Sequence, residues 1–352
     1  MGLALFEARR WVGRNGRVRG VVRAGMGENA DLVTQLDALE RGVAFAHLPC
    51  GDVLRVVGPD HREALHRVVS QDIRGMREGD GRLALLLAPK GQFQAIMAVF
   101  AAEDGAYLLC PPGKGGAVAS SLGKYLRFSH SRIEPLAHDA GFCLLGAGWR
   151  TAAGRLVAHV DRLAAGGVSG ARGEAGPIWF GQTLLGLPGA IAVSRDAADT
   201  ARLSARFVET GAIEVGTAAI ELERIRVGWP TWGAELTETV LPPEAGLEKL
   251  AISYTKGCYV GQETIARLAT YGHPNRALVG LRQRSNETSS PALPLSLSAP
   301  TEEKPRGILT SWGFHPGLGG VGLGLVRREL AGPGTRLAGG SREFDVTPIP
   351  LW

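Results

Sequence analysis

The stretch that decides the fold covers residues 251–274 and reads AISYTKGCYVGQETIARLATYGHP. Its pattern predicts a short strand over residues 251–254, a turn at Lys256-Gly257, and a helix over residues 261–272 that Pro274 stops. The one cysteine of this stretch, Cys258, therefore lies just before a helix N-terminus.

Cys258 has the surroundings of a reactive thiol. Unpaired backbone N–H groups at a helix N-terminus and the ammonium of Lys256 favour a thiolate, and Gly257 leaves the sulfur accessible. Glu263 and Arg267 have the spacing of a structural i,i+4 ion pair. The alternative for a lone cysteine is a small buried hydrophobic residue, and the stretch by itself leaves both interpretations open.

The other cysteines and the histidines point to no further chemistry. Cys50, Cys110 and Cys143 lie among apolar, proline or glycine residues, so we interpret them as buried and structural. Neither the cysteines nor the eight histidines have the spacing of metal ligands. The sequence therefore predicts no metal site.

The segment KGCYVGQE, continued to an arginine, closely resembles the signature of the YgfZ family. That family consists of folate-binding relatives of the glycine cleavage T-protein, implicated in iron-sulfur enzyme maintenance and tRNA modification. The resemblance implies a catalytic role for two residues, Cys258 and Lys256. The motif residues that it adds are Gly257, Tyr259, Gly261, Gln262, Glu263 and Arg267.

Further stretches extend the resemblance from about residue 53 to the C-terminus. The family pattern R-I-x-x-G-x-P-x-x-G is matched over residues 224–233, and L-P-x-E-x-G-L is matched within residues 241–247. Shorter similarities lie at residues 71–73, 89–91 and 307–311. The match is weakest between residues 140 and 210.

The fold class that we expect is α+β: a three-lobed, ring-like T-protein/YgfZ fold around a central folate pocket that the cysteine motif faces. The expected ranges are a basic tail over 1–35, a first α+β lobe over 36–138, a second lobe with the cysteine motif over 139–275, and a small C-terminal β-barrel over 276–352 with a mobile loop at 285–306. The alternation of predicted strands and helices over residues 53–136 independently indicates a split β-α-β-β-α-β unit with one additional strand.

The resemblance implies tetrahydrofolate or a derivative as cofactor, but two positions depart from the family. Residues 92–96 read QFQAI and lack the aspartate that serves aminomethyl transfer in the T-protein, which argues against a classical aminomethyltransferase. Arg226 replaces the pterin-holding glutamate, and a cation cannot accept the hydrogen bonds of a pterin. Arg226 either binds an anionic ligand group or is a solvated arginine near a helix C-terminus. The cofactor-binding candidates are Arg224, Arg226, Trp229 and Glu244.

Charge and composition limit the functional classes. The chain has 352 residues and a net charge of +5, and residues 1–25 alone hold six arginines against one acid, so the remainder is neutral. That basic start is a basic arm, a transit peptide, a dispensable tail or a misassigned start. The neutral body predicts no direct nucleic-acid partner, and no apolar stretch is long enough for a membrane helix.

Three functions are weighed on these grounds. The first is a cytoplasmic, folate-binding accessory protein for assembly or repair of iron-sulfur enzymes, which acts through Cys258, has those client enzymes or assembly factors as partners, and affects tRNA modification indirectly. The second is a folate-dependent aminomethyl or one-carbon transferase. The third is a non-catalytic scaffold, with no folate affinity and an inert Cys258.

Overall fold

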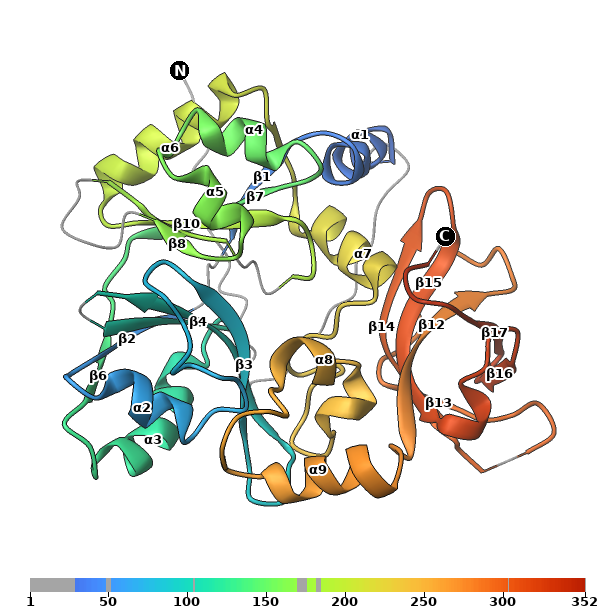
Figure 1. Ribbon diagram of the computed structural model, residues 1–352. Coiled ribbons are helices and arrows are strands. Elements are labelled where there is room, and N and C mark those ends of the chain that lie inside the picture. Colours follow the sequence, from blue (N-terminus) through green and yellow to red (C-terminus); the bar gives the residue numbers. More distant parts are fainter. Residues whose placement is uncertain are drawn as a thin grey trace.

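A computed structural model describes residues 29–48, 52–103, 105–169, 176–181, 185–302 and 304–351. These residues form three lobes, each built on one β-sheet, which lie around a ring (Figure 1). The α+β, three-lobed fold that the sequence predicts is confirmed. Cys50 and the basic start, residues 1–28, lie outside the described residues.

The first lobe is a five-stranded antiparallel sheet in the order β3-β4-β5-β2-β6. Its elements are β2 (Asp52–Val57), α2 (His61–His66), β3 (Gly81–Leu87), β4 (Phe93–Ala102), β5 (Gly105–Cys110), α3 (Gly115–Leu126) and β6 (Arg132–Pro135). This is the predicted split unit with its additional strand. Strand β4 is an almost unbroken apolar run because α2 and α3 cover one face of the sheet and the second lobe covers the other.

The second lobe is a six-stranded sheet in the order β11-β1-β7-β10-β9-β8. Its elements are α1 (Asn29–Glu40), β1 (Ala44–Leu48), β7 (Ala140–Leu145), α4 (Trp149–Gly154), α5 (Val160–Ala164), β8 (Val168–Ser169), β9 (Ile178–Phe180), β10 (Gly189–Ser194), α6 (Ala197–Glu209), β11 (Ile213–Glu214) and α7 (Thr217–Val227). Cys143 is buried in the core that this sheet shares with the first lobe, and Cys110 is buried under α3. Burial raises the pKa of Cys110 to about 12, so the structural interpretation of both thiols holds.

The third lobe is a six-stranded antiparallel sheet in the order β13-β14-β15-β12-β17-β16. Its elements are β12 (Arg276–Gln283), β13 (Leu295–Leu297), β14 (Gly307–His315), β15 (Gly319–Arg327), η2 (Arg328–Leu330), β16 (Arg336–Gly339) and β17 (Arg342–Thr347). A pair of backbone hydrogen bonds between Ser298 and Ala338 nearly closes the sheet into the predicted barrel. Inside it, the rings of Trp312 and Phe344 pack edge to face, 5.8 Å apart.

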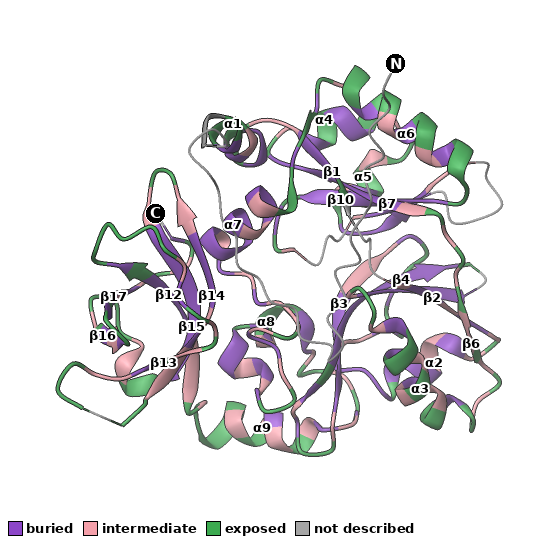
Figure 2. Cartoon of the chain, turned by 180° about the vertical axis from the view of Figure 1, so that it is seen from behind, coloured by how far each residue is buried: buried purple, intermediate pink, exposed green. Residues whose placement is uncertain are grey.

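Three contacts close the ring. The first and second lobes meet where Val168 donates a backbone hydrogen bond to Gly79. Helix α7 joins the second lobe to the barrel by packing on β14 and β15. The connecting elements η1 (Pro242–Ala245), α8 (Glu248–Ala251) and α9 (Gln262–Tyr271) join the first lobe to the barrel. The strands of the three sheets are mostly buried, whereas the helices on the outside of the molecule expose one face to solvent (Figure 2).

The structure divides the chain differently from the expected ranges. Helix α1 begins at Asn29, and its Leu32, Leu36 and Leu39 are buried in the second lobe, so a tail that extends to residue 35 is wrong. Strand β1 pairs with β7 and therefore also belongs to the second lobe, although it precedes the first lobe in sequence. The range 285–306 is not one loop, because β13 pairs with β14.

The stretch around Cys258 also differs from its predicted form. Residues 251–254 form no strand: Ala251 ends α8, and Ala251 and Ile252 are buried against β3 and β4 instead of joining a sheet. The predicted helix is α9, which begins at Gln262 and ends at Tyr271. Its N-terminal end lies against the first lobe and not within the second.

Candidate functional site

The cysteine loop, residues 256–261, is tied to the first lobe by the side chain of Lys256. Its ammonium donates to three backbone carbonyls, those of His66, Val69 (2.6 Å) and Gln71 (3.3 Å). An ammonium has three N–H donors, so these acceptors use all of them. Lys256 therefore anchors the loop to the segment that follows α2, and it does not direct a hydrogen bond at the sulfur of Cys258.

Two residues on the other side of Cys258 hold the loop from within. Tyr259 is buried in the hydrophobic cluster between β3, β4 and the barrel, and its ring lies 5.0 Å from the Lys256 ammonium. Burial raises the pKa of Tyr259 to about 12. The side-chain oxygen of Gln262, a residue of the motif, accepts from the backbone N–H of Tyr259 at 3.2 Å and so holds the loop. Cys258 itself is exposed, so an accessible thiol stands between two anchored neighbours.

Gly261 brings the cysteine loop against the turn between β3 and β4. It has a φ of 80°, and a Cβ there would lie 2.4 Å from the carbonyl oxygen of Ala88 and 3.2 Å from the Cα of Gly91. Only glycine fits both conditions. Two stretches that resemble the family, residues 89–91 and 256–263, are thus in direct contact.

Gly257 has a different role from Gly261. Its φ is not in the left-handed region, and a Cβ there would meet nothing within 4 Å among the described residues. The tight turn expected at this position is therefore not what requires glycine. The small residue leaves open space beside the thiol.

Lys256 lies in a cluster of ionisable groups on the first lobe. Burial lowers the pKa of Lys256 to about 8, against the opposing charge of Asp72. The ring Nδ1 of His66 accepts from the backbone N–H groups of Ile73 and Arg74, both at 3.3 Å, and lies 3.1 Å from a carboxylate oxygen of Asp72. Burial, followed by the charge of Lys256, lowers the pKa of His66. The imidazole is therefore neutral near pH 7 and acts as a fixed acceptor.

Glu263 and Arg267 lie on the exposed face of α9. They do not form the predicted i,i+4 ion pair, and neither has another polar partner within the described ranges. Both side chains are exposed to solvent on α9, the helix that follows the cysteine loop.

The family pattern over residues 224–233 lies in a second site, between α7 and the barrel. All five N–H donors of Arg224 are used: Glu221 takes two, and the carbonyl of Trp229, the carboxylate of Glu235 and the hydroxyl of Ser311 take the others. Arg224 is 2% exposed and Glu235 is 0% exposed. Burial opposes the charge, but Glu235 and Glu221 keep the pKa of Arg224 above its usual value.

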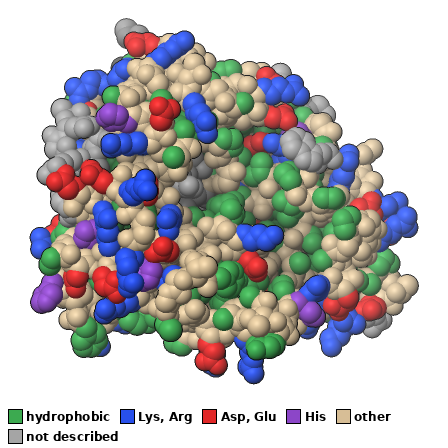
Figure 3. Space-filling view, in the orientation of Figure 1, with side chains coloured by type: hydrophobic (Ala, Val, Ile, Leu, Met, Phe, Trp, Pro, Cys, Tyr) green, Lys and Arg blue, Asp and Glu red, His purple; other side chains and the backbone are tan. Residues whose placement is uncertain are grey.

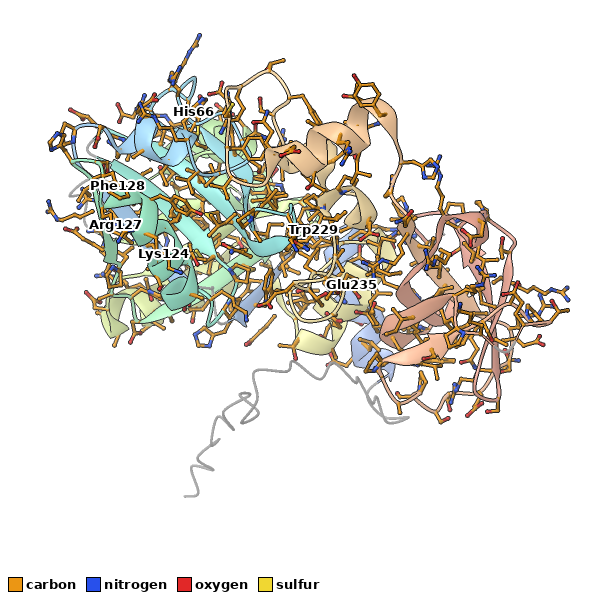
Figure 4. The ribbon with its side chains drawn as sticks, turned by 90° about the horizontal axis from the view of Figure 1, so that it is seen from below. His66, Lys124, Arg127, Phe128, Trp229 and Glu235 are labelled. Atoms are coloured by element: carbon orange, nitrogen blue, oxygen red, sulfur yellow. The ribbon has the colours of Figure 1, made fainter. Side chains whose placement is uncertain are left out.

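Glu235 is the centre of this second site, and the sequence analysis missed it. Its carboxylate accepts from the backbone N–H of Thr231 and from the hydroxyls of Thr310 and Ser311, besides Arg224. The signal in the sequence was an acid two residues beyond Trp232-Gly233, at the end of the matched pattern. Trp229 and Glu235 lie near each other in the middle of the molecule, away from His66 (Figure 4).

Arg226 is not a solvated arginine, and the carboxylate that it binds belongs to the protein itself. Its guanidinium binds both carboxylate oxygens of Glu223 at 2.6 and 2.7 Å, and both residues are buried. Hydrogen bonding to Glu223 raises the pKa of Arg226. His315 of β14 faces this pair, and burial, together with the charge of Arg226, lowers its pKa. Arg226 therefore forms a buried structural ion pair.

The polar residues predicted to hold a folate are occupied by the protein itself. Glu244 accepts from the backbone N–H of Leu241 and from two nitrogens of Arg276, which ties η1 to β12. Trp229 is half-buried, and its ring packs so closely against Gly186 that a Cβ at that glycine would lie 2.7 Å from two ring atoms. Arg224, Arg226 and Glu244 thus do not fit the role of pterin ligands, and no step is assigned to a folate at these residues.

The two sites pack on one hydrophobic cluster. Tyr259 of the cysteine loop and Trp229 of the second site both pack against the cluster around β3, β4 and the barrel. Hydrophobic side chains gather on the front face where the lobes meet (Figure 3). Within the described residues, no group of three or more metal-ligating side chains occurs, and no helix combines the length and apolar character that crossing a membrane requires.

The fold is that of a glycine cleavage T-protein. The aminomethyltransferase T of Bartonella henselae superposes on 91% of this chain and 89% of its own, with a TM-score of 0.77 and 18% sequence identity. No protein-family profile matches the sequence.

Sequence comparisons show which proteins the chain resembles. A protein of Arabidopsis thaliana, provisionally named as a chloroplastic transferase, is 28% identical over 89% of this chain and 71% of its own length. The tRNA-modifying protein YgfZ of Cronobacter sakazakii is 26% identical over 67% of this chain and 70% of its own. An aminomethyltransferase of Corynebacterium jeikeium is 28% identical, but over 44% of this chain and 40% of the enzyme. In sequence the chain is similar to YgfZ and to aminomethyltransferases, and its fold is that of a T-protein.

Proposed function

We propose that this chain is a YgfZ-type accessory protein for the assembly or repair of iron-sulfur enzymes that acts through Cys258. The observation that carries the proposal is the cysteine loop, in which an exposed thiol is held between the anchored Lys256 and the buried Tyr259. A thiol that is fixed in place and open to solvent is suited to direct reaction with a protein client. A cytoplasmic location and an indirect effect on tRNA modification are part of this proposal.

The sequence that follows the β3–β4 turn, which Gly261 contacts, supports an accessory role over aminomethyl transfer. Strand β4 begins directly after that turn, at Phe93, and its first residues alternate between the core and solvent. Residues 92–96 hold two glutamines and no carboxylate, so no general base of the T-protein kind is present at this position.

The experiment is rescue of a bacterial strain that lacks its own YgfZ-type protein, read as the activity of its iron-sulfur enzymes. Cys258→Ala should abolish rescue while the protein reaches wild-type abundance. Tyr271→Ala, which removes another exposed side chain from the same segment, is the matched control and should rescue fully. Full rescue by Cys258→Ala would refute the role of the thiol.

Folate binding is a separate part of the proposal, and it rests on the family. Since the predicted polar ligands are engaged elsewhere, any folate must be bound by other residues. Anaerobic calorimetry with tetrahydrofolate tests this: a dissociation constant in the micromolar range, about −8 kcal/mol, would support a folate-binding accessory protein. Absence of binding would leave a folate-independent accessory protein.

A folate-dependent one-carbon transferase is the second candidate, favoured by the sequence matches to aminomethyltransferases. It predicts catalytic consumption of methylene-tetrahydrofolate when amine or protein acceptors are supplied. Lack of turnover over a panel of such acceptors would exclude it, while leaving the accessory role untouched.

A further inference from the structure

Helix α3 and the turn that follows it form a cationic region in a body that is neutral as a whole. No acidic residue occurs between Asp104 and Glu134, and this interval holds Lys114, Lys124, Arg127 and Arg132. Two of these cations have partners elsewhere: Lys114 lies over the ring of Trp232, and Arg132 pairs with Glu134. Lys124 and Arg127 are exposed and have no acidic partner in the described part of the chain.

An exposed aromatic side chain lies beside these two cations. Phe128 is 84% exposed, and the Arg127 guanidinium lies 4.9 Å from the centre of its ring. Tyr125, on the same turn of α3, is 40% exposed. Lys124, Arg127 and Phe128 follow one another along one side of the first lobe (Figure 4). We call these four residues, Lys124, Tyr125, Arg127 and Phe128, the α3 platform.

The turn that follows the α3 platform is tied to the segment before α2 by His130 and Ser131. The carboxylate of Asp60 accepts from the Ser131 hydroxyl at 2.5 Å and from the backbone N–H of His130 at 3.1 Å. Gly58, with a φ of 134°, lies so close that a Cβ there would be 2.3 Å from the His130 carbonyl oxygen. Phe128 is therefore exposed next to a turn that these contacts hold in place.

A purely structural explanation accounts for only part of this arrangement. Cations at the end of a helix are favourable because they face the negative end of its dipole. That effect explains Lys124 and Arg127 but not a phenylalanine that leaves most of its surface in water, since burial of such a side chain is favourable.

We propose that the α3 platform binds unpaired nucleotides of an RNA. A base stacks on the exposed face of Phe128, and Lys124 and Arg127 contact the neighbouring phosphates. A membrane surface fits less well because membrane-binding helices present their apolar face, whereas Val118, Leu122 and Leu126 of α3 are buried in the first lobe. The neutral body argued against nucleic acid at the level of the whole chain, but the local charge favours it.

The test is fluorescence anisotropy of the full chain with a labelled oligouridylate of about 12 nucleotides, within the range of single-strand binding sites. Phe128→Ala should weaken binding by about 5- to 150-fold, which is the loss of one stacked base, and Phe128→Trp should retain it. Neutralising both cations, with Lys124→Gln and Arg127→Gln, should make the salt dependence less steep. The slope of log affinity against log salt should become less negative by about 1.4.

Two exposed residues outside the α3 platform provide matched controls. Tyr271→Ala removes an aromatic side chain that is 88% exposed, and Lys304→Gln removes an exposed cation; neither should change the affinity. Unchanged binding by Phe128→Ala, or equal losses in the two controls, would overturn the proposal. So would Phe128-dependent binding to phosphatidylserine vesicles without binding to the oligonucleotide, which would assign the surface to a membrane.

Discussion

The cysteine loop and the Arg224–Glu235 site both resemble the family in sequence, but they use their polar groups in opposite ways. In the cysteine loop, hydrogen bonds of Lys256 and Gln262 hold the loop in place, and the thiol of Cys258 is exposed. In the other site, the polar groups of Arg224 and Glu235 bind each other and the barrel. The comparison teaches that one family pattern leaves an exposed thiol, whereas the other builds a buried polar network.

The largest effect that sharpens this comparison is expected at Arg224. Arg224→Met would leave Glu235 buried without its counter-ion, and removal of one partner of a buried ion pair costs about 3–5 kcal/mol. Urea unfolding measures the loss. Arg284→Met, which breaks exposed pairs with Asp345 and Glu343, should cost less than about 1 kcal/mol. Equal losses for the two variants would show that the Arg224–Glu235 site is not architectural.

The next effect separates the two glycines of the cysteine loop. Gly261→Ala combines a left-handed φ with a clash against the Ala88 carbonyl, so it should lower the free energy of unfolding by about 2–4 kcal/mol. Gly257→Ala has open space and should stay within about 0.5 kcal/mol. Thermal unfolding distinguishes the two, and a neutral Gly261→Ala would contradict the contact with the β3–β4 turn.

A smaller effect with a pH signature is expected at Lys256. Lys256→Met removes the charged donor from three carbonyls and should cost about 1–3 kcal/mol at pH 7. Because the pKa of Lys256 is about 8 in the folded protein and 10.5 as its ordinary value, the unfolded chain binds more protons between these pH values. The wild type should therefore gain stability relative to Lys256→Met as pH rises from 8 to 10.5.

The quantity that tests this prediction is the difference in unfolding free energy between the wild type and Lys256→Met, followed as a function of pH. Urea unfolding of both proteins at several pH values gives it directly. A difference that is flat across the window, or that falls, would show that folding does not lower the pKa of Lys256.

The sequence predicted most of the fold because its strands and helices are locally marked. Strand β4 is an apolar run bounded by Gly91 and Gly105, and α9 has both a start and a stop signal. The sequence-based predictions were wrong where contacts with segments far away in the sequence determine the local structure. Strand β1 joins a sheet whose other strands follow much later, and residues 251–254 are apolar because they pack on β3 and β4.

The candidate site was predicted in part. The loop around Cys258 was identified from its motif, and Gln262, a residue of that motif, holds it. The sequence could not show that Lys256 turns toward the carbonyls of residues 66–71, because those acceptors lie almost 190 residues away in the chain. Nor could it show that Glu223 and Glu235 occupy the arginines assigned to folate, since ion pairing depends on the tertiary packing.

One measurement tests the difference between the two sites most directly: urea unfolding of Arg226→Met and Cys258→Ala side by side. Arg226→Met should lose about 3–5 kcal/mol because Glu223 is then left buried without its partner. Cys258→Ala should stay within about 0.5 kcal/mol of the wild type, as expected for an exposed side chain. A neutral Arg226→Met, or a strongly destabilised Cys258→Ala, would contradict the account.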